Sequence, residues 1–307
     1  PVPFSSNLRA ALFMAVAMAT FTMNDTITKL VLETVSLGQV LLVRGLFATV
    51  LIFLLAWSRG ALRRPKQVMQ PMVALRTLCE MAATLTFVIA LSHMPLANIS
   101  AVLQALPLAV TMGAALFFGE TVGWRRWLAI AFGFAGVLVI VQPGFEGFNA
   151  FALLALLSVA CAAARDLVTR RIPDEVPSML VSTATAATVT ILGGLIVLFY
   201  GGWEPLPAPS LGLLAASSVV LITGYQFVIM AMREGDISFV APFRYTALIW
   251  ALTLGYLVFG ETPDLAMIAG ASIIVLSGLY ALYRERKVGG GKPAAESTNP
   301  GMAPDGL

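Results

Sequence analysis

The sequence is poor in charged residues. Only 11% of its 307 residues are charged, whereas a soluble domain carries about 25%. Hydrophobic residues make up 59% of the chain, and its mean hydropathy is +0.88. Such a chain has too little charge to cover its surface in water, but lipid would solvate it. The composition therefore predicts a multi-pass protein of the cytoplasmic (inner) cell membrane with the lipid bilayer as a partner.

Histidine and cysteine are also scarce, since the chain has one histidine, His93, and two cysteines, Cys79 and Cys161. They form no CxxC pair and no ligand cluster, so we predict no metal site and no cofactor. A membrane-embedded enzyme would need a clustered base, nucleophile or metal set, which argues against an enzyme. The net charge of +3 resides in short loops between apolar runs, so nucleic acid is not a predicted partner. A scaffold subunit remains a weaker alternative.

Long apolar runs are what the sequence has in abundance. A bilayer core about 30 Å thick takes about 20 helical residues, and runs of that length recur along the chain. We therefore predict an all-α membrane protein of ten transmembrane helices. The predicted spans are 8–31, 37–58, 68–92, 96–117, 124–141, 149–170, 177–200, 209–232, 237–258 and 264–283.

Basic residues are distributed unevenly between the loops. If the N-terminus is cytoplasmic, Arg63, Arg64, Arg125, Arg126 and Arg171 all lie on the inner side. The outer loops then hold Lys29 and several acidic residues. Because cytoplasmic loops carry an excess of lysine and arginine, we predict that both termini are cytoplasmic. The tail 288–307 is rich in Gly, Pro and Ala and is predicted to be disordered.

The chain resembles itself at an offset of 139 to 141 residues. The segment 25–29, DTITK, recurs as 166–170, DLVTR, and the segment 118–121, FGET, recurs at 259–262. We therefore predict two five-helix repeats, 1–143 and 144–287. Because each repeat has an odd number of spans, the second enters the membrane from the opposite side. Inverted repeats are typical of secondary transporters that work by alternating access.

The two FGET motifs are each followed by a Gly- and Ala-rich helix, and a proline-bearing helix precedes each of them. In this the chain resembles the EamA family of the drug/metabolite transporter (DMT) superfamily, over about residues 8–284. The resemblance implies a ten-helix inverted-repeat fold, with a central cavity lined by the first, third, fourth, sixth, eighth and ninth spans. It implies neither metal nor ATP. Within the family, exporters of aromatic amino acids and importers of S-adenosylmethionine both show similar features, which leaves the substrate and the direction of transport open.

Charged residues inside the spans are the first candidates for function, because a charge near mid-bilayer costs about 2.5–3.5 kcal/mol and usually faces the bundle interior or water. Arg244 is the leading candidate, as a guanidinium that could hold a substrate carboxylate. An ion pair with Asp236 or Glu80 is its alternative. The residues predicted to act in gating or coupling are Asp25, Asp166, Arg165, Arg76, Glu80, Pro107 and Pro242.

For this second group the alternatives are structural. Arg76 and Glu80 are four residues apart and could pair on one helix face. Arg165 and Asp166 are sequence neighbours, so we expect that they do not face each other on a helix and that one of them finds its partner elsewhere. Proton coupling through a carboxylate and passive exchange down a gradient are both compatible with the sequence.

Neutral polar and aromatic residues on the same helices complete the predicted site for a small-molecule substrate. An apolar cavity with few fixed polar groups suits a small amphipathic ligand. With Arg244, the predicted substrate-binding residues are Tyr245, Gln104, Thr84, Phe87, Tyr225, Gln226, Asn98 and Trp250. Small residues in the fifth and tenth spans predict either a scaffold seam or a homodimer face. The sequence therefore predicts a secondary transporter of small organic solutes. The family resemblance implies an exporter of aromatic or other hydrophobic amino acids and related metabolites, with an importer or exchanger of S-adenosylmethionine or another metabolite as the alternative.

Overall fold

The computed structural model describes residues 4–62, 65–142, 150–173 and 175–288. Its α-helices are α1 (Phe4–Leu32), α2 (Leu37–Ser58), α3 (Pro71–His93), α4 (Leu96–Leu103), α5 (Leu106–Phe118), α6 (Trp124–Val141), α7 (Phe151–Thr169), α8 (Ser178–Tyr200), α9 (Ala208–Glu234), α10 (Ile237–Val240), α11 (Thr246–Phe259) and α12 (Leu265–Val288). Two 3₁₀ helices, η1 (Pro65–Met69) and η2 (Ala241–Tyr245), interrupt them. Apart from Val288, the predicted tail lies outside the described residues.

Ten helical segments of the described chain are long and apolar enough to cross a membrane. They coincide with the ten predicted spans to within a few residues, so the predicted all-helical fold is confirmed. Two of the spans are broken: α4 and α5 form the fourth span, and η2 with α11 forms the ninth. An even number of crossings places both ends of the described chain on the same side of the membrane.

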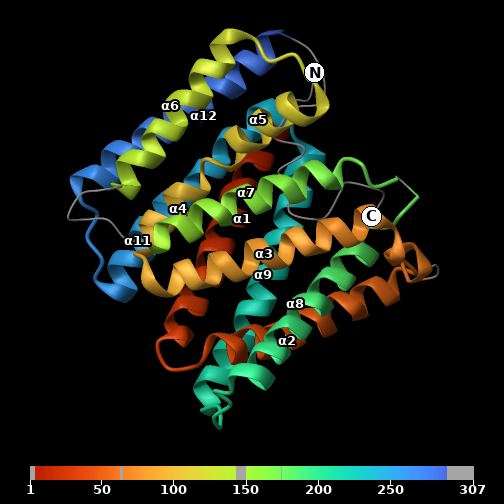
Figure 1. Cartoon of the computed structure of the whole chain (residues 1–307). Helices are drawn as coiled ribbons and strands as arrows, with labels where there is room; N and C mark the ends of the chain where they lie inside the picture. Colours follow the sequence, from red (N-terminus) through yellow and green to blue (C-terminus); the bar gives the residue numbers. More distant parts are fainter. Residues whose placement is uncertain (1–3, 63–64, 143–149, 174, 289–307) are drawn as a thin grey trace.

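The most extensive helix contacts all join one five-helix half to the other. In Figure 1, α6 lies beside α12 at one edge and α2 beside α8 at the opposite edge, with α1, α3, α7 and α9 between them. Within this centre α1 packs along α9, and α3 packs along α7. Exchanging the two halves maps α1·α9 onto α7·α3 and leaves the α2·α8 and α6·α12 pairs unchanged. This pairing is what an inverted repeat with a two-fold axis in the membrane plane requires.

Glycines bring α6 and α12 into close contact. A Cβ atom on Gly136 would lie 2.7 Å from the carbonyl oxygen of Gly270, and one on Gly270 would lie 2.5 Å from the carbonyl oxygen of Gly136. Small residues allow such close approach of helices in membranes. These two glycines therefore form a seam within the molecule, one of the two alternatives that the sequence left open.

We expect Gly136→Ala to lower the melting temperature of the purified protein. The added methyl group meets a backbone carbonyl, which cannot rotate away, and overpacking of this kind costs about 1–3 kcal/mol. Gly212→Ala in α9 is the matched control, since nothing lies within 4 Å of its Cβ position. Thermal unfolding in detergent should show a loss for Gly136→Ala alone; equal melting temperatures would contradict the seam.

Candidate functional site

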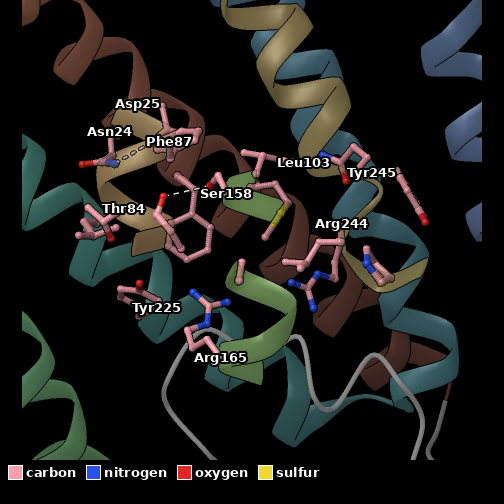
Figure 2. A pocket seen from close by; sticks show the side chains of 18 of the residues that line it. Asn24, Asp25, Thr84, Phe87, Leu103, Ser158, Arg165, Tyr225, Arg244 and Tyr245 are labelled. Carbon is pink, nitrogen blue, oxygen red and sulfur yellow. Dashed lines mark hydrogen bonds between the residues drawn. The ribbon is translucent and has the colours of Figure 1, made fainter. Parts of the chain in front are cut away.

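A cavity of about 290 Å³ lies between the two halves. Figure 2 shows side chains pointing into it from α1, α3, α7, α9 and the two broken spans. These are the first, third, fourth, sixth, eighth and ninth spans, as the family resemblance implied, and Leu282 of α12 adds to them. The cavity is therefore built from both repeats.

The breaks in the two interrupted spans lie at the cavity wall. Gln104 caps α4, and its N–H donates to the Ser100 and Ala101 carbonyls at 3.2 and 3.1 Å. Pro107 follows in the first turn of α5, where a missing N–H costs little. In the other half, η2 ends at Tyr245. The offset between Gln104 and Tyr245 equals the offset between the two FGET motifs, so the two residues occupy equivalent positions in the repeat. Repeat-related breaks thus place Gln104 and Tyr245 against the cavity.

A cluster of charges at the cavity joins α7 of the second half to α3 of the first. The guanidinium of Arg165 lies 3.0 Å from Glu80 on α3 and 2.7 Å from Asp166. Arg165 and Glu80 line the cavity, whereas Asp166 lies behind them and is only 2% exposed. Because one cation serves two carboxylates in a region of low dielectric, the three side chains form one electrostatic unit.

Two sequence expectations about this cluster were wrong. Arg165 and Asp166 do contact each other, because the long arginine side chain curls back so that its Nε atom donates to Asp166 Oδ1 at 2.8 Å. Glu80 pairs with Arg165, and Arg76 instead donates to Thr169 at 3.1 Å and to Thr185 at 2.8 Å. Helix α7 packs closely enough on α3 to supply these partners, which outweighs the weak i,i+4 attraction along α3.

The first half contributes a second polar cluster, made from Asn24, Asp25, Thr28 and Arg44. The Asn24 amide donates to Asp25 at 3.0 Å, and Arg44 donates to the oxygens of Asn24 and Thr28 at 3.3 and 3.2 Å. Thr28 and Thr169 are related by the repeat, yet Thr28 receives an arginine from α2 and Thr169 receives one from α3. The two halves therefore share a backbone plan but differ in side-chain charge.

Aromatic rings separate the two clusters. Phe21 packs edge-on against Tyr225, with ring centroids 5.1 Å apart, and Phe87 lines the cavity beside Thr84. Figure 2 shows Asn24 and Asp25 toward one end of the cavity and Arg165 and Arg244 toward the other. A ligand in this space would meet a carboxylate, aromatic faces and guanidinium groups in turn.

The structure brings most of the predicted site residues together. Those lining the cavity are Arg244, Tyr245, Gln104, Thr84, Phe87, Tyr225, Asp25, Arg165, Glu80 and Pro107. Asp166 and Arg76 contact residues of the lining or its supporting helices. Asn98, Gln226, Trp250 and Pro242 are not among the lining residues. Trp250 is 38% exposed on α11, which suits a ring that meets lipid.

Several lining residues were not predicted, among them Phe21, Asn24 and Ser158. Their spacing along the helices could have identified two of them. Phe21 precedes Asp25 by one turn, and Ser158 precedes Arg165 by two turns, so each lies on the same helix face as a predicted residue. The Ser158 hydroxyl donates to the Ala83 carbonyl at 3.0 Å, which ties α7 to α3 at the cavity.

The comparison with family models matches both halves of the chain. Residues 8–142 and 149–283 each match the model of the EamA-like transporter family. The chain belongs to this family. The two matches correspond to the two five-helix halves and support the inverted repeat that the helix pairing indicates.

Characterised EamA relatives align over most of the chain. The pseudopaline exporter CntI of Pseudomonas aeruginosa is 27% identical over 91% of this chain and 98% of the relative. The S-adenosylmethionine uptake transporter of Rickettsia prowazekii is 25% identical over 91% of this chain and 94% of the relative. The riboflavin transporter of Vibrio cholerae is 31% identical over 61% of this chain and 62% of the relative.

A solved crystal structure shares the fold, with a TM-score of 0.61 and 18% sequence identity over 94% of this chain and the whole of the other. EamA membership makes the protein a multi-pass metabolite transporter of the membrane and not an enzyme. The relatives named above carry different solutes. Family membership therefore identifies the type of activity but not the substrate, which has to be inferred from the cavity.

Proposed function

We propose that this EamA protein is a secondary transporter that exports amino acids with an aromatic or other hydrophobic side chain. The observation that carries the proposal is the order of groups along the cavity: Asp25 lies at one end and Arg244 at the other, and Phe87 lies between them, with Phe21 and Tyr225 also in the lining. A carboxylate at Asp25 suits an ammonium group, and a guanidinium suits a carboxylate. The rings between them suit an apolar or aromatic side chain.

The size of the cavity supports a small substrate. Ligand pockets for drug-sized molecules span about 300–1,000 Å³, and this cavity of about 290 Å³ is at the small end of that range. A single amino acid fits such a volume better than a large conjugated metabolite does. The paired halves support alternating access, because an inverted repeat gives one chain two related conformations that open to opposite sides.

Import or exchange of an S-adenosylmethionine-like metabolite is the second candidate. The uptake transporter of Rickettsia prowazekii, 25% identical to this chain, favours it. The three rings beside Asp25 add a physical reason, since aromatic faces attract an organic cation. The solute that is carried separates this candidate from amino acid export.

Solute counterflow in proteoliposomes tests the proposal. Vesicles loaded with unlabelled phenylalanine or leucine are expected to accumulate the labelled amino acid transiently, and S-adenosylmethionine should compete weakly. Analogues that lack the ammonium or the carboxylate should drive counterflow more slowly than the parent amino acid. Equal counterflow with and without an imposed pH gradient would indicate exchange without proton coupling. Counterflow with S-adenosylmethionine but with no amino acid would overturn the proposal in favour of the second candidate.

A further inference from the structure

Two ion pairs join the two halves outside the cavity. Lys29, in the last turn of α1, pairs with Glu261 in the turn between α11 and α12. Arg170, at the end of α7, pairs with Glu120 in the turn between α5 and α6 at 3.0 Å. We call them the Lys29 pair and the Arg170 pair. Each pair links the first helix of one half to a turn of the other half.

The repeat relates the two pairs to each other. Lys29 and Arg170 end the repeated segments 25–29 and 166–170, and Glu120 and Glu261 belong to the two FGET motifs. The turns are alike: the preceding glycines have φ values of 67° and 65°, and the glutamate N–H groups donate to the carbonyls of Ala114 and Gly255. Glycine readily adopts this left-handed conformation after a helix. The motif thus holds its glutamate in the same position in both halves.

The phenylalanine of each motif also faces a basic residue from the other half. Lys29 Nζ lies 4.8 Å from the centre of the Phe259 ring, and the guanidinium of Arg171 lies 4.4 Å from that of Phe118. A ring face and a carboxylate together form a suitable receptor for a cation. Each FGET motif is therefore a receptor for the basic end of the first helix of the opposite half.

The two receptors lie at opposite faces of the membrane, with the cavity between them. Lys29 lies one turn beyond the lining residue Asp25 on α1, and Arg170 lies five residues beyond the lining residue Arg165 on α7. Because α1 and α7 are separated by five crossings, their ends point to opposite sides. The Lys29 pair therefore lies at one end of the path through the cavity, and the Arg170 pair lies at the other.

We propose that the two pairs are the locks of the two gates and that they break in alternation during transport. Opening toward the Lys29 side separates Lys29 from Glu261, and opening toward the Arg170 side separates Arg170 from Glu120. The proposal rests on the transport function above, to which it adds named gating residues that neither the charge pattern nor the family match assigns.

The two locks differ in strength. The Lys29 and Glu261 side chains are 12% and 18% exposed, whereas those of Arg170 and Glu120 are 22% and 50% exposed. Lys29 also donates to the Met94 carbonyl at 2.6 Å, and Glu261 accepts from the N–H of Leu96, the first residue of α4, at 2.7 Å. The carboxylate thus caps α4 as well as holding α1. We infer that the protein rests with its Lys29 side closed.

Access of a thiol reagent to the cavity from each side tests the locks. The reporter is Leu221→Cys, in the cavity lining but outside the predicted substrate-binding residues, on a background with Cys79→Ala and Cys161→Ala. A membrane-impermeant maleimide is applied to one face of sealed vesicles at a time. The test variants are Lys29→Gln and Glu120→Gln, and the matched control is Glu234→Gln, which breaks an exposed Arg9–Glu234 pair between α1 and α9.

We expect a crossed pattern, in which each variant raises the labelling rate from one side of the membrane and the two variants affect opposite sides. Lys29→Gln should raise the labelling rate from the Lys29 side about tenfold or more, because it breaks the enclosed lock. Glu120→Gln should raise labelling from the Arg170 side only, by about two- to fivefold, since its lock is more exposed. The Lys29→Arg variant should be labelled at the same rates as the reporter alone, because it keeps the positive charge and arginine occupies the equivalent position, Arg170, in the second repeat. Glu234→Gln should change neither rate.

Three results would overturn the locks: labelling that rises equally from both sides, labelling that is unchanged in both variants, or Lys29→Arg behaving like Lys29→Gln. Counterflow by the reporter protein itself reports the transport function separately. If the reporter protein carries solute but the crossed pattern is missing, the locks are wrong while the transport function stands. Size-exclusion chromatography shows whether each variant folds. Glu261→Gln replaces Lys29→Gln if the latter does not fold, and Arg170→Gln replaces Glu120→Gln in the same way.

Discussion

Arg165→Gln is expected to abolish accumulation of folded protein in the membrane, or to lower its melting temperature more than any other single change described above. The substitution leaves Glu80 and Asp166 without the cation that lies 3.0 and 2.7 Å from them. Removing one partner of a buried ion pair costs about 3–5 kcal/mol, because the remaining charge stays desolvated. Here two carboxylates lose their partner together. Thermal unfolding in detergent, with fluorescence-detected size exclusion, measures the loss.

A triple variant separates this electrostatic cause from a loss of packing. Glu80→Gln, Arg165→Gln and Asp166→Asn together remove all three charges, and the triple variant loses the same arginine packing as Arg165→Gln alone. Most of the cost of breaking a buried pair comes from the charge left without a partner, and the triple variant leaves no such charge, so it should recover most of the lost melting temperature. Arg9→Gln, in an exposed pair with Glu234, is the matched control and should change little. A triple variant as unstable as Arg165→Gln alone would contradict the electrostatic account.

The ten spans could be predicted because they depend only on residue composition over about 20 positions. The positions of α2 and α6 illustrate this, since the predicted spans 37–58 and 124–141 match Leu37–Ser58 and Trp124–Val141. Pro107 and Pro242 indicated in the sequence which spans are broken, but the first break lies three residues before Pro107, at Gln104. Proline fits the first turn of α5, so it marks the start of the helix that follows the break.

The partners of the buried charges could not be predicted in the same way. They depend on how each helix is rotated about its axis and on which helix it packs against, and a single sequence encodes neither directly. Arg76 illustrates this, since it reaches across to Thr169 and Thr185 in place of Glu80 one turn away. The repeat did contain unused information. The segments 25–29 and 166–170 and the two FGET motifs were recognised as repeats. A two-fold axis would bring the basic segment of each half to the FGET motif of the other half.

The symmetry of the fold and the asymmetry of its charges have separate consequences. The exchange of α1·α9 with α7·α3 gives two related packings, which is what opening to either side requires. A cavity with identical halves would offer the same groups at both ends. In this protein the polar groups lining the α1 end are Asn24 and Asp25, whereas the other end has Arg244 and the Arg165–Glu80 pair. A substrate with unlike ends therefore has a preferred orientation in the cavity.

That preferred orientation leads to an expected change of specificity in Arg244→Gln. Transport of amino acids with a free carboxylate should fall by about 10- to 100-fold, because a hydrogen bond to a charged group contributes about 1.5–3 kcal/mol. Transport of the corresponding amides, which lack the negative charge, should fall much less. Counterflow of phenylalanine and of phenylalaninamide by the same vesicles measures the ratio. Arg244→Lys should keep part of the preference, since it retains the charge but loses the bidentate geometry.

Trp250→Phe provides the matched control for this experiment. Trp250 lies in the same span as Arg244 but is 38% exposed and is not among the cavity-lining residues. The Trp250→Phe substitution should therefore change neither the transport rate of the acid nor that of the amide. Equal losses for the acid and the amide in Arg244→Gln would mean that Arg244 supports the broken span and does not read the substrate. A selective loss for the acid would instead fix the carboxylate at the η2 end. The ammonium would then lie toward Asp25, and the apolar side chain against Phe21, Phe87 and Tyr225.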